Sequence, residues 1–192
     1  MISPKRKAVN MSGLPTHFPT HQHAPEFWTA LGRAIATFGF LEEILGKAIF
    51  AFTATQECDE NEIELELQKW HKTLINAIVD PLSQLIILYE KSVSNNQNVT
   101  ITNLDKLIGD LRAASKIRNV LCHGSWRLPD SDGKSIPLFV SKQGEIFETA
   151  IDIAFLEQVQ RHVAELSCSV INTVSYMGYQ FPGTNGHGKS VL

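Results

Sequence analysis

Hydrophobic residues recur every three or four positions along four segments of this chain, which is the spacing of an amphipathic α-helix. The first segment begins at Pro25, a residue type favoured in the first turn of a helix, and continues with Glu26. Its apolar positions are Leu31, Ile35, Phe38, Leu41, Leu45 and Ile49. The pattern predicts one long helix here.

The second segment keeps the same period but contains a proline. Its apolar positions are Leu67, Trp70, Leu74, Ile78, Leu82, Leu85 and Leu88. Because Pro81 lies among them and lacks a backbone N–H, we expect it to kink the helix or to split it in two.

The third and fourth segments have clear ends. The third begins at about Thr102, its predicted N-cap, and stops at Gly124, a residue type that often follows a helix. Its apolar positions are Leu104, Leu107, Leu111, Ala114, Ile117 and Leu121. The fourth runs from about Asp152 to just before Gly178, with Leu156, Val159, Val163, Leu166, Val170, Val174 and Met177.

The pattern changes between Trp126 and Thr149. Turn-forming residues cluster first, namely Pro129, Asp130, Asp132 and Gly133. Residues 136–140 and 145–147 then read as two short strands around a Lys-Gln-Gly turn. The sequence therefore predicts an all-α fold, an up-and-down four-helix-type bundle with a small β-hairpin insert before the last helix.

The two ends of the chain lack a helical or strand period. We expect a flexible N-terminal arm over residues 1–24, a helical domain over residues 25–178 and a flexible C-terminal tail over residues 179–192. The arm carries His17, His21 and His23, whose spacing resembles a metal site. Without a carboxylate or thiol nearby, a solvated arm is the better interpretation, and we expect neither a metal nor another cofactor.

Composition narrows the class of protein. The 192 residues are 43% hydrophobic, enough for one domain to form a core unaided. Three cysteines without a C-x-x-C pair favour a reducing compartment, and no apolar stretch is long enough for a signal peptide or a membrane span. We therefore expect a cytoplasmic protein without membrane contact. Its net charge of −3 means that any polyanion must be bound by a local basic patch.

Two opposite charges fall on apolar helix faces. At about 100° per residue, Arg118 lies within the apolar stripe of the third segment and Glu42 within that of the first, whereas Glu43 points outward. An inward-facing guanidinium needs a partner, so we predict a contact between Arg118 and Glu42. The ion pair either only fixes the register of the two helices or orients an arginine that also binds phosphate. A dimer interface would serve equally well, since a half-buried stripe can face a second copy of the chain.

The opposite side of the third segment is polar and mostly basic. Its residues are Arg112, Lys116, Asn119 and His123, at helical spacing. Such a stripe is either a solvated helix face or a track for a phosphate backbone. Just beyond the helix, Arg127 would extend the track and Trp126 would offer a base-stacking surface, unless Trp126 belongs to the core.

The run Arg118-Asn119-Val120-Leu121-Cys122-His123 resembles the motif of HEPN domains: an Arg, a polar residue, three further positions and a His near the end of a helix in a helical bundle. The resemblance covers roughly residues 25–178. It implies a homodimer in which two such helices form one composite site. In the nuclease members it also implies metal-independent cleavage of RNA, in roles such as a toxin or a phage-defence effector controlled by an antitoxin or regulatory protein.

The chemistry of these side chains agrees with RNA cleavage. The 2′-hydroxyl of RNA is an internal nucleophile close to the phosphorus, so a metal is not strictly required. We assign acid/base catalysis to His123, the phosphate clamp to Arg118, and orientation of the scissile group or of the histidine to Asn119. Glu42 would support Arg118.

Two alternatives stay open at this point. His123 could be a helix-terminal histidine that only caps backbone carbonyls. The chain could also be a non-catalytic HEPN dimer that acts as an RNA-binding, scaffold or regulatory module. Arg118 and His123 point about 140° apart on one helix, so a dimer would bring them together better than a single copy would.

Overall fold

The computed structural model describes residues 10–54, 63–79, 81–96 and 101–184, and this part of the chain is all-α. It contains the α-helices α1 (Pro25–Ala54), α2 (Ile63–Val79), α3 (Leu82–Ser94), α4 (Leu104–His123) and α5 (Ile153–Tyr176), and the short 3-10 helices η1 (Met11–Gly13) and η2 (Thr20–Gln22). None of the described helices has both the length and the apolar character that crossing a membrane requires.

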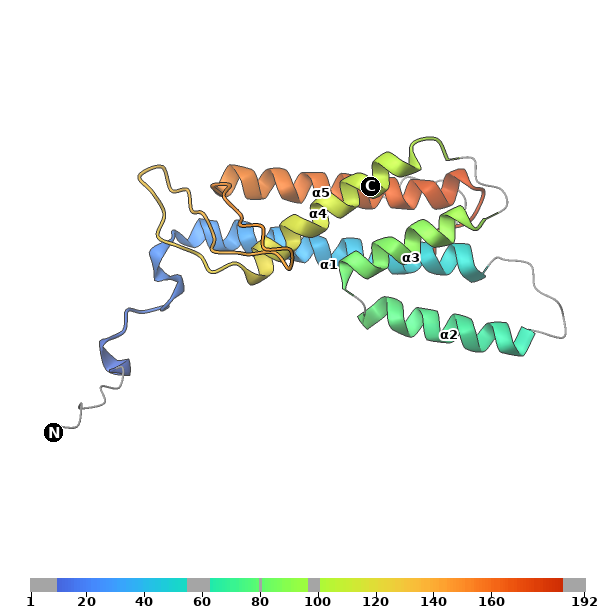
Figure 1. Ribbon diagram of the computed structural model, residues 1–192, viewed down its shortest axis with the longest axis horizontal. Helices are drawn as coiled ribbons and strands as arrows, with labels where there is room; N and C mark the ends of the chain where they lie inside the picture. Colours follow the sequence, from blue (N-terminus) through green and yellow to red (C-terminus); the bar gives the residue numbers. More distant parts are fainter. Residues whose placement is uncertain (1–9, 55–62, 80, 97–100, 185–192) are drawn as a thin grey trace.

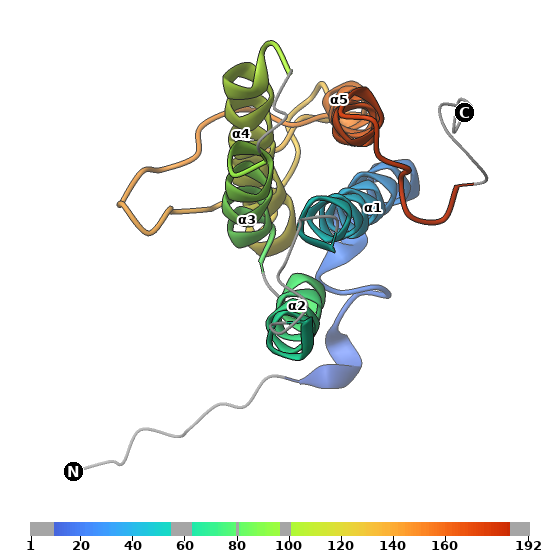
Figure 2. The same ribbon diagram turned by 90° about the vertical axis from the view of Figure 1, so that its right-hand side faces the viewer.

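Helix α1 lies at the centre of the fold. It packs against α5, α3, α2 and α4, while α3 also contacts α4 and α4 contacts α5. Successive helices run in alternating directions, so α1 and α5 are parallel (Figure 1). The end view shows α3 and α4 on one side of the α1 and α5 pair, with α2 next to α1 (Figure 2).

The helical period correctly predicted most of the core. In α1, every predicted apolar position is buried except Ile35, which is partly buried. The apolar positions predicted for the fourth segment are buried in α5 apart from Val159, which is partly buried against the core, as is Met177 just after the helix. The predicted start of this helix at about Asp152 is confirmed. Asp152 is the N-cap residue of α5, and its carboxylate accepts a 2.7 Å hydrogen bond from the backbone N–H of Phe155.

The described part of the chain contains five α-helices instead of the four expected, because Pro81 splits the second predicted segment into α2 and α3. Pro81 becomes the N-cap residue of α3 in extended conformation, and α2 ends at Val79. A proline in a helix interior removes a hydrogen bond and clashes with the preceding turn, which explains the break. The N-cap prediction for α4 was wrong by one residue. Asn103, in left-handed conformation with φ 77°, holds that position instead of Thr102.

The predicted β-hairpin does not form as two strands. In residues 124–152 the structure has isolated antiparallel bridges, Ser125 with Leu138, Ser135 with Ile151 and Val140 with Ile146. Positions 135, 138 and 140 thus pair with three different segments, and Pro137 between them has no N–H to donate. No ladder can grow from such pairs. The turn at residues 141–145 still closes as expected, with the Ser141 N–H donating to the Glu145 carbonyl at 2.8 Å.

Packing extends beyond the predicted domain boundaries of residues 25 and 178. On the N-terminal side, His23 is buried and the Trp28 indole N–H donates to the Thr20 carbonyl at 2.7 Å. On the C-terminal side, Phe181 is buried and Tyr179 packs against the core. The flexibility of the arm and tail stays a prediction.

Candidate functional site

The predicted contact between Arg118 and Glu42 is present. The Arg118 Nη2 atom lies 3.5 Å from the Glu42 Oε1 atom, and the two side chains keep 27% and 29% of their exposure. Both are therefore half-buried, because the long arginine side chain carries its charged group from the apolar face of α4 to the edge of the core. The ion pair links α4 to α1.

This geometry leaves part of the guanidinium available. A guanidinium carries five N–H donors in a rigid fork. Among the described residues, Glu42 is the one acidic partner of Arg118, at a distance longer than an ordinary hydrogen bond. Arg118 can therefore keep its ion pair and still donate to an anion at the surface.

His123 is the last residue of α4, and its side chain is exposed. His123 is the basic residue in the last turn of α4, as the capping alternative expects. No hydrogen bond from its ring to a backbone carbonyl is present among the described residues, and the backbone N–H of Gly124 donates to the Val120 carbonyl at 2.8 Å. In the described part of the chain the His123 imidazole has no hydrogen-bond or ionic partner. Its ring nitrogens are open to a ligand.

Gly124 places the insert directly against the end of α4. A Cβ atom at this position would lie 2.6 Å from the Val120 carbonyl oxygen and 2.8 Å from the Pro137 Cβ. Both distances are shorter than real Cβ contacts. The absence of a side chain at Gly124 is thus what lets Pro137 pack directly against the residue that follows α4.

The basic stripe of α4 is exposed, but its charge is partly compensated. Arg112 forms a 2.5 Å ion pair with Glu90 of α3. Lys116 is exposed, Asn119 is partly buried, and neither has an ionic partner in the described residues. Arg127, just beyond the helix, is exposed and also without an ion pair there. The free positive charge near His123 therefore comes from Lys116 and Arg127 rather than from Arg112.

Trp126 belongs to an aromatic cluster at the start of α1. Its ring meets the rings of Phe27 and Trp28 edge to face, with centroids 5.0 and 6.4 Å away. The His23 ring stacks on Phe27 at 4.4 Å. Trp126 is partly buried by these contacts, which favours the core interpretation over a free stacking surface for RNA bases.

His23 is the residue of this region whose packing the sequence interpretation missed. It is buried, and its Nε2 atom has no hydrogen-bond partner among the described residues. Burial lowers the pKa of His23 below its ordinary value, because the charged imidazolium would lose its hydration. The spacing of His23 and Phe27 was a usable signal, but Pro25 between them suggested a boundary.

The structure thus brings Arg118 and Glu42 together and leaves His123 elsewhere on α4. Five residues of α-helix rotate the two side chains about 140° apart, so one copy of the chain presents them on different sides. No described group of three or more His, Cys, Asp or Glu side chains is arranged to hold a metal ion. The residues present can supply a cation, an imidazole and an amide.

Comparison of the chain with models of protein families, with curated proteins and with solved structures found no significant match. The functional interpretation therefore rests on the geometry of these side chains.

Proposed function

We propose that this protein is a metal-independent endoribonuclease of the HEPN type. The observation that carries the proposal is the half-buried Arg118, held by Glu42 of α1, on the same helix that ends with an exposed imidazole at His123. An arginine oriented by a carboxylate and a histidine without a protein partner are the two groups that cleavage by an RNA 2′-hydroxyl needs.

In the proposed reaction, the 2′-hydroxyl attacks the adjacent phosphorus and the bond to the 5′-oxygen of the next nucleotide breaks. The products are a 2′,3′-cyclic phosphate and a free 5′-hydroxyl. The His123 imidazole takes the proton from the nucleophile or gives one to the leaving oxygen. Arg118 donates to the phosphoryl oxygens as negative charge develops on them. Asn119 would orient the scissile group from the same helix.

We propose that the acting species is a homodimer. In two copies related by a twofold axis, the His123 of one chain can lie beside the Arg118 of the other, which removes the problem that they diverge by about 140° on one helix. Lys116 and Arg127 would contact the RNA backbone near this composite site.

We place the activity in the cytoplasm, in a toxin or phage-defence role that an antitoxin or regulatory protein would control.

A second candidate is a HEPN-type dimer that binds RNA or another protein without cleaving. The same ion pair favours it, because a contact between α1 and α4 also stabilises helix packing when no reaction takes place. The compensation of Arg112 by Glu90 favours the form of this candidate that binds a protein, since it lowers the charge of the stripe that is available to RNA. In that case Arg118 and His123 would be surface determinants of binding.

Incubation of purified protein with single-stranded RNA in EDTA separates the two candidates. The enzyme proposal expects cleavage to products with 2′,3′-cyclic phosphate ends, reduced roughly 10²- to 10⁴-fold in His123→Ala, the range of acid/base catalysis. His162→Ala is the matched control, because His162 is an exposed histidine on α5. Undiminished cleavage by His123→Ala would overturn the assignment. RNA binding without cleavage by the unaltered protein would favour the module.

A further inference from the structure

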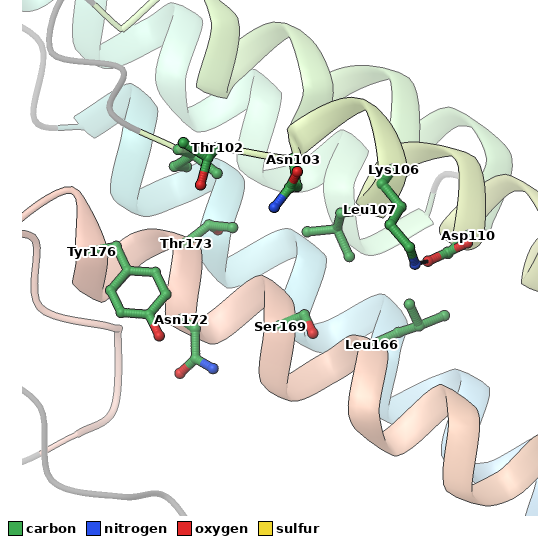
Figure 3. A pocket seen from close by; sticks show the side chains of 11 residues that line it. Thr102, Asn103, Lys106, Leu107, Asp110, Leu166, Ser169, Asn172, Thr173 and Tyr176 are labelled. Carbon is green, nitrogen blue, oxygen red and sulfur yellow. Dashed lines mark hydrogen bonds and ion pairs between the residues drawn. The ribbon is translucent and has the colours of Figure 1, made fainter.

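A groove lies between the beginning of α4 and the C-terminal half of α5, remote from His123. It encloses about 610 Å³, and Leu107 and Leu166 provide apolar surface within it (Figure 3). Asn103 precedes His123 by 20 positions in the sequence, about 30 Å of helix at 1.5 Å per residue. The groove is therefore separate from the candidate nuclease site.

Two primary amides from opposite walls have unused hydrogen-bonding capacity. Asn103 holds the N-cap position of α4, yet its side chain makes no capping bond. Asn172 on α5 is exposed. Figure 3 shows the Asn103 amide between the two helices and the Asn172 side chain on α5 next to Tyr176, at the outer edge of the groove. Neither amide has a hydrogen-bond partner in the described residues, so both can bind a ligand in the groove.

An aromatic ring stands beside one of these amides. Tyr176 is 75% exposed, although a tyrosine usually packs much of its ring. It follows Asn172 by four positions on α5, which places the two side chains on the same helix face (Figure 3). The ring can therefore stack on a flat ligand whose edge reaches the amide.

Among the described residues that line the groove, the two charged side chains compensate each other. Lys106 and Asp110 on the α4 wall form a 2.6 Å ion pair with each other. The Thr173 hydroxyl is already bonded to Tyr89 and to a carbonyl of its own helix. The Ser169 hydroxyl donates to the Glu165 carbonyl of its own helix. What is left for a ligand is two amides, a phenol, the Thr102 hydroxyl and apolar surface, which favours a neutral planar molecule with hydrogen-bonding edges over a phosphate.

We propose that this groove binds a nucleobase. A base offers adjacent donors and acceptors along its edge, which a primary amide can match two at a time, and a ring face that stacks on tyrosine. The apolar surface of Leu107 and Leu166 covers the rest of the heterocycle. The base belongs either to a free nucleoside or to single-stranded nucleic acid. The proposal goes beyond the nuclease proposal and does not depend on it.

Titration of the full chain with nucleosides, followed by ligand-observed NMR, tests the site. Adenosine, guanosine, cytidine and uridine are the probes, and ribose 5-phosphate is the probe without a base. We expect saturable binding of at least one nucleoside and none of ribose 5-phosphate. Tyr176→Ala should weaken binding roughly fivefold or more, as loss of one stacking ring does. Tyr176→Phe should largely retain binding.

Further variants separate the groove from the rest of the surface. Asn172→Ala should weaken binding, whereas Asn95→Ala should not, because Asn95 is an exposed asparagine at the end of α3 outside the groove. Thermal unfolding of each variant checks that it is folded. Three results would each overturn the proposal. They are binding of ribose 5-phosphate as tight as that of the nucleosides, no saturable nucleoside binding, and nucleoside affinities of Tyr176→Ala and Asn172→Ala equal to that of the unaltered protein.

A fully 2′-O-methylated oligonucleotide identifies the source of the base, because it cannot be cleaved by 2′-hydroxyl attack. Tighter binding of the oligonucleotide than of the nucleoside, with the gain lost in Tyr176→Ala, supports a groove site for single-stranded nucleic acid. Oligonucleotide binding that Tyr176→Ala does not weaken, or that is no tighter than nucleoside binding, supports a groove site for a free nucleoside. His123→Ala should leave nucleoside affinity unchanged. Failure of RNA cleavage and failure of base binding are therefore distinguishable outcomes.

Discussion

The burial of His23 could not be predicted from the sequence pattern around it. As one of three histidines in a proline-interrupted segment, it has the pattern of a solvated arm. Its burial depends on the rings of Phe27 and Trp28, and on Trp126 from about 100 residues later in the chain. Local periodicity carries no information on such a distant contact, whereas the pairing of Arg118 with Glu42 was predictable because each lies on a regular helix.

The buried imidazole of His23 predicts a loss of stability in mild acid. The pKa of His23 in the folded protein lies below its ordinary value of 6.5, so the unfolded chain binds the proton more readily. Stability is therefore lost as the pH falls below about 6.5. His23→Phe keeps an aromatic ring and removes the titration. Its melting temperature should fall less between pH 7.5 and 5.5 than that of the unaltered protein.

His162→Gln is the control for this measurement, because His162 is exposed on α5. It should show the same acid response as the unaltered protein. If His23→Phe also shows that full response, then His23 is not the group responsible.

Gly124 and Gly109 lie at the end and in the interior of α4, and alanine should act in opposite directions at these positions. At Gly124 the new Cβ would meet Val120 and Pro137, so we expect a loss of about 1–3 kcal/mol from overpacking. At Gly109 an added Cβ would meet no atom within 4 Å outside the local backbone of its own helix, so alanine should stabilise the helix by about 0.5–1 kcal/mol. Denaturant unfolding measures both. Equal stabilities of the two variants would contradict the contact between insert and helix.

At the level of elements, the apolar period predicted helices well where each helix has one buried face. It predicted α1 and α5 nearly in full, and it indicated the break at Pro81 as one of two outcomes. It was less accurate for α4, where Ile108 and Ser115 are also buried because α1, α3 and α5 all contact this helix. The apolar period did not predict the pairs Ser125 with Leu138 and Ser135 with Ile151, because these residues are 13 and 16 positions apart in the sequence.

The link between α1 and α4 can be tested through its carboxylate. Glu42→Gln removes the charge and keeps the shape. If Glu42 orients Arg118 for catalysis, RNA cleavage should fall about 10- to 100-fold, because small misplacements of a catalytic group are costly. The melting temperature should change little, since the pair is partly exposed. Glu43→Gln is the matched control, because its partner is Lys47 on the outer side of α1. A lower melting temperature with unchanged cleavage would mean that the pair serves helix register alone.

At the level of the whole molecule, the two main residues of the candidate site, Arg118 and His123, lie on different sides of α4. A twofold assembly would bring the Arg118 of one copy next to the His123 of the other. Arg118 is half-buried beside α1, whereas His123 is exposed at the end of α4 next to the insert. The rotation between the two positions followed from helix geometry alone. The position of the second copy that would complete the site could not be predicted in this way, because contacts between the surfaces of two copies leave no periodic pattern in the sequence of one chain.

Mixing two inactive variants tests the composite site directly. Arg118→Ala and His123→Ala each lack one group, and each homodimer should be inactive in both of its sites. After subunit exchange, half of the dimers are mixed, and in each of these one site combines the intact Arg118 of one copy with the intact His123 of the other. The mixture should then recover about one quarter of the cleavage rate of the unaltered protein. Catalysis within a single chain would give no recovery at any mixing ratio, and titration of one variant against a fixed amount of the other distinguishes the two cases.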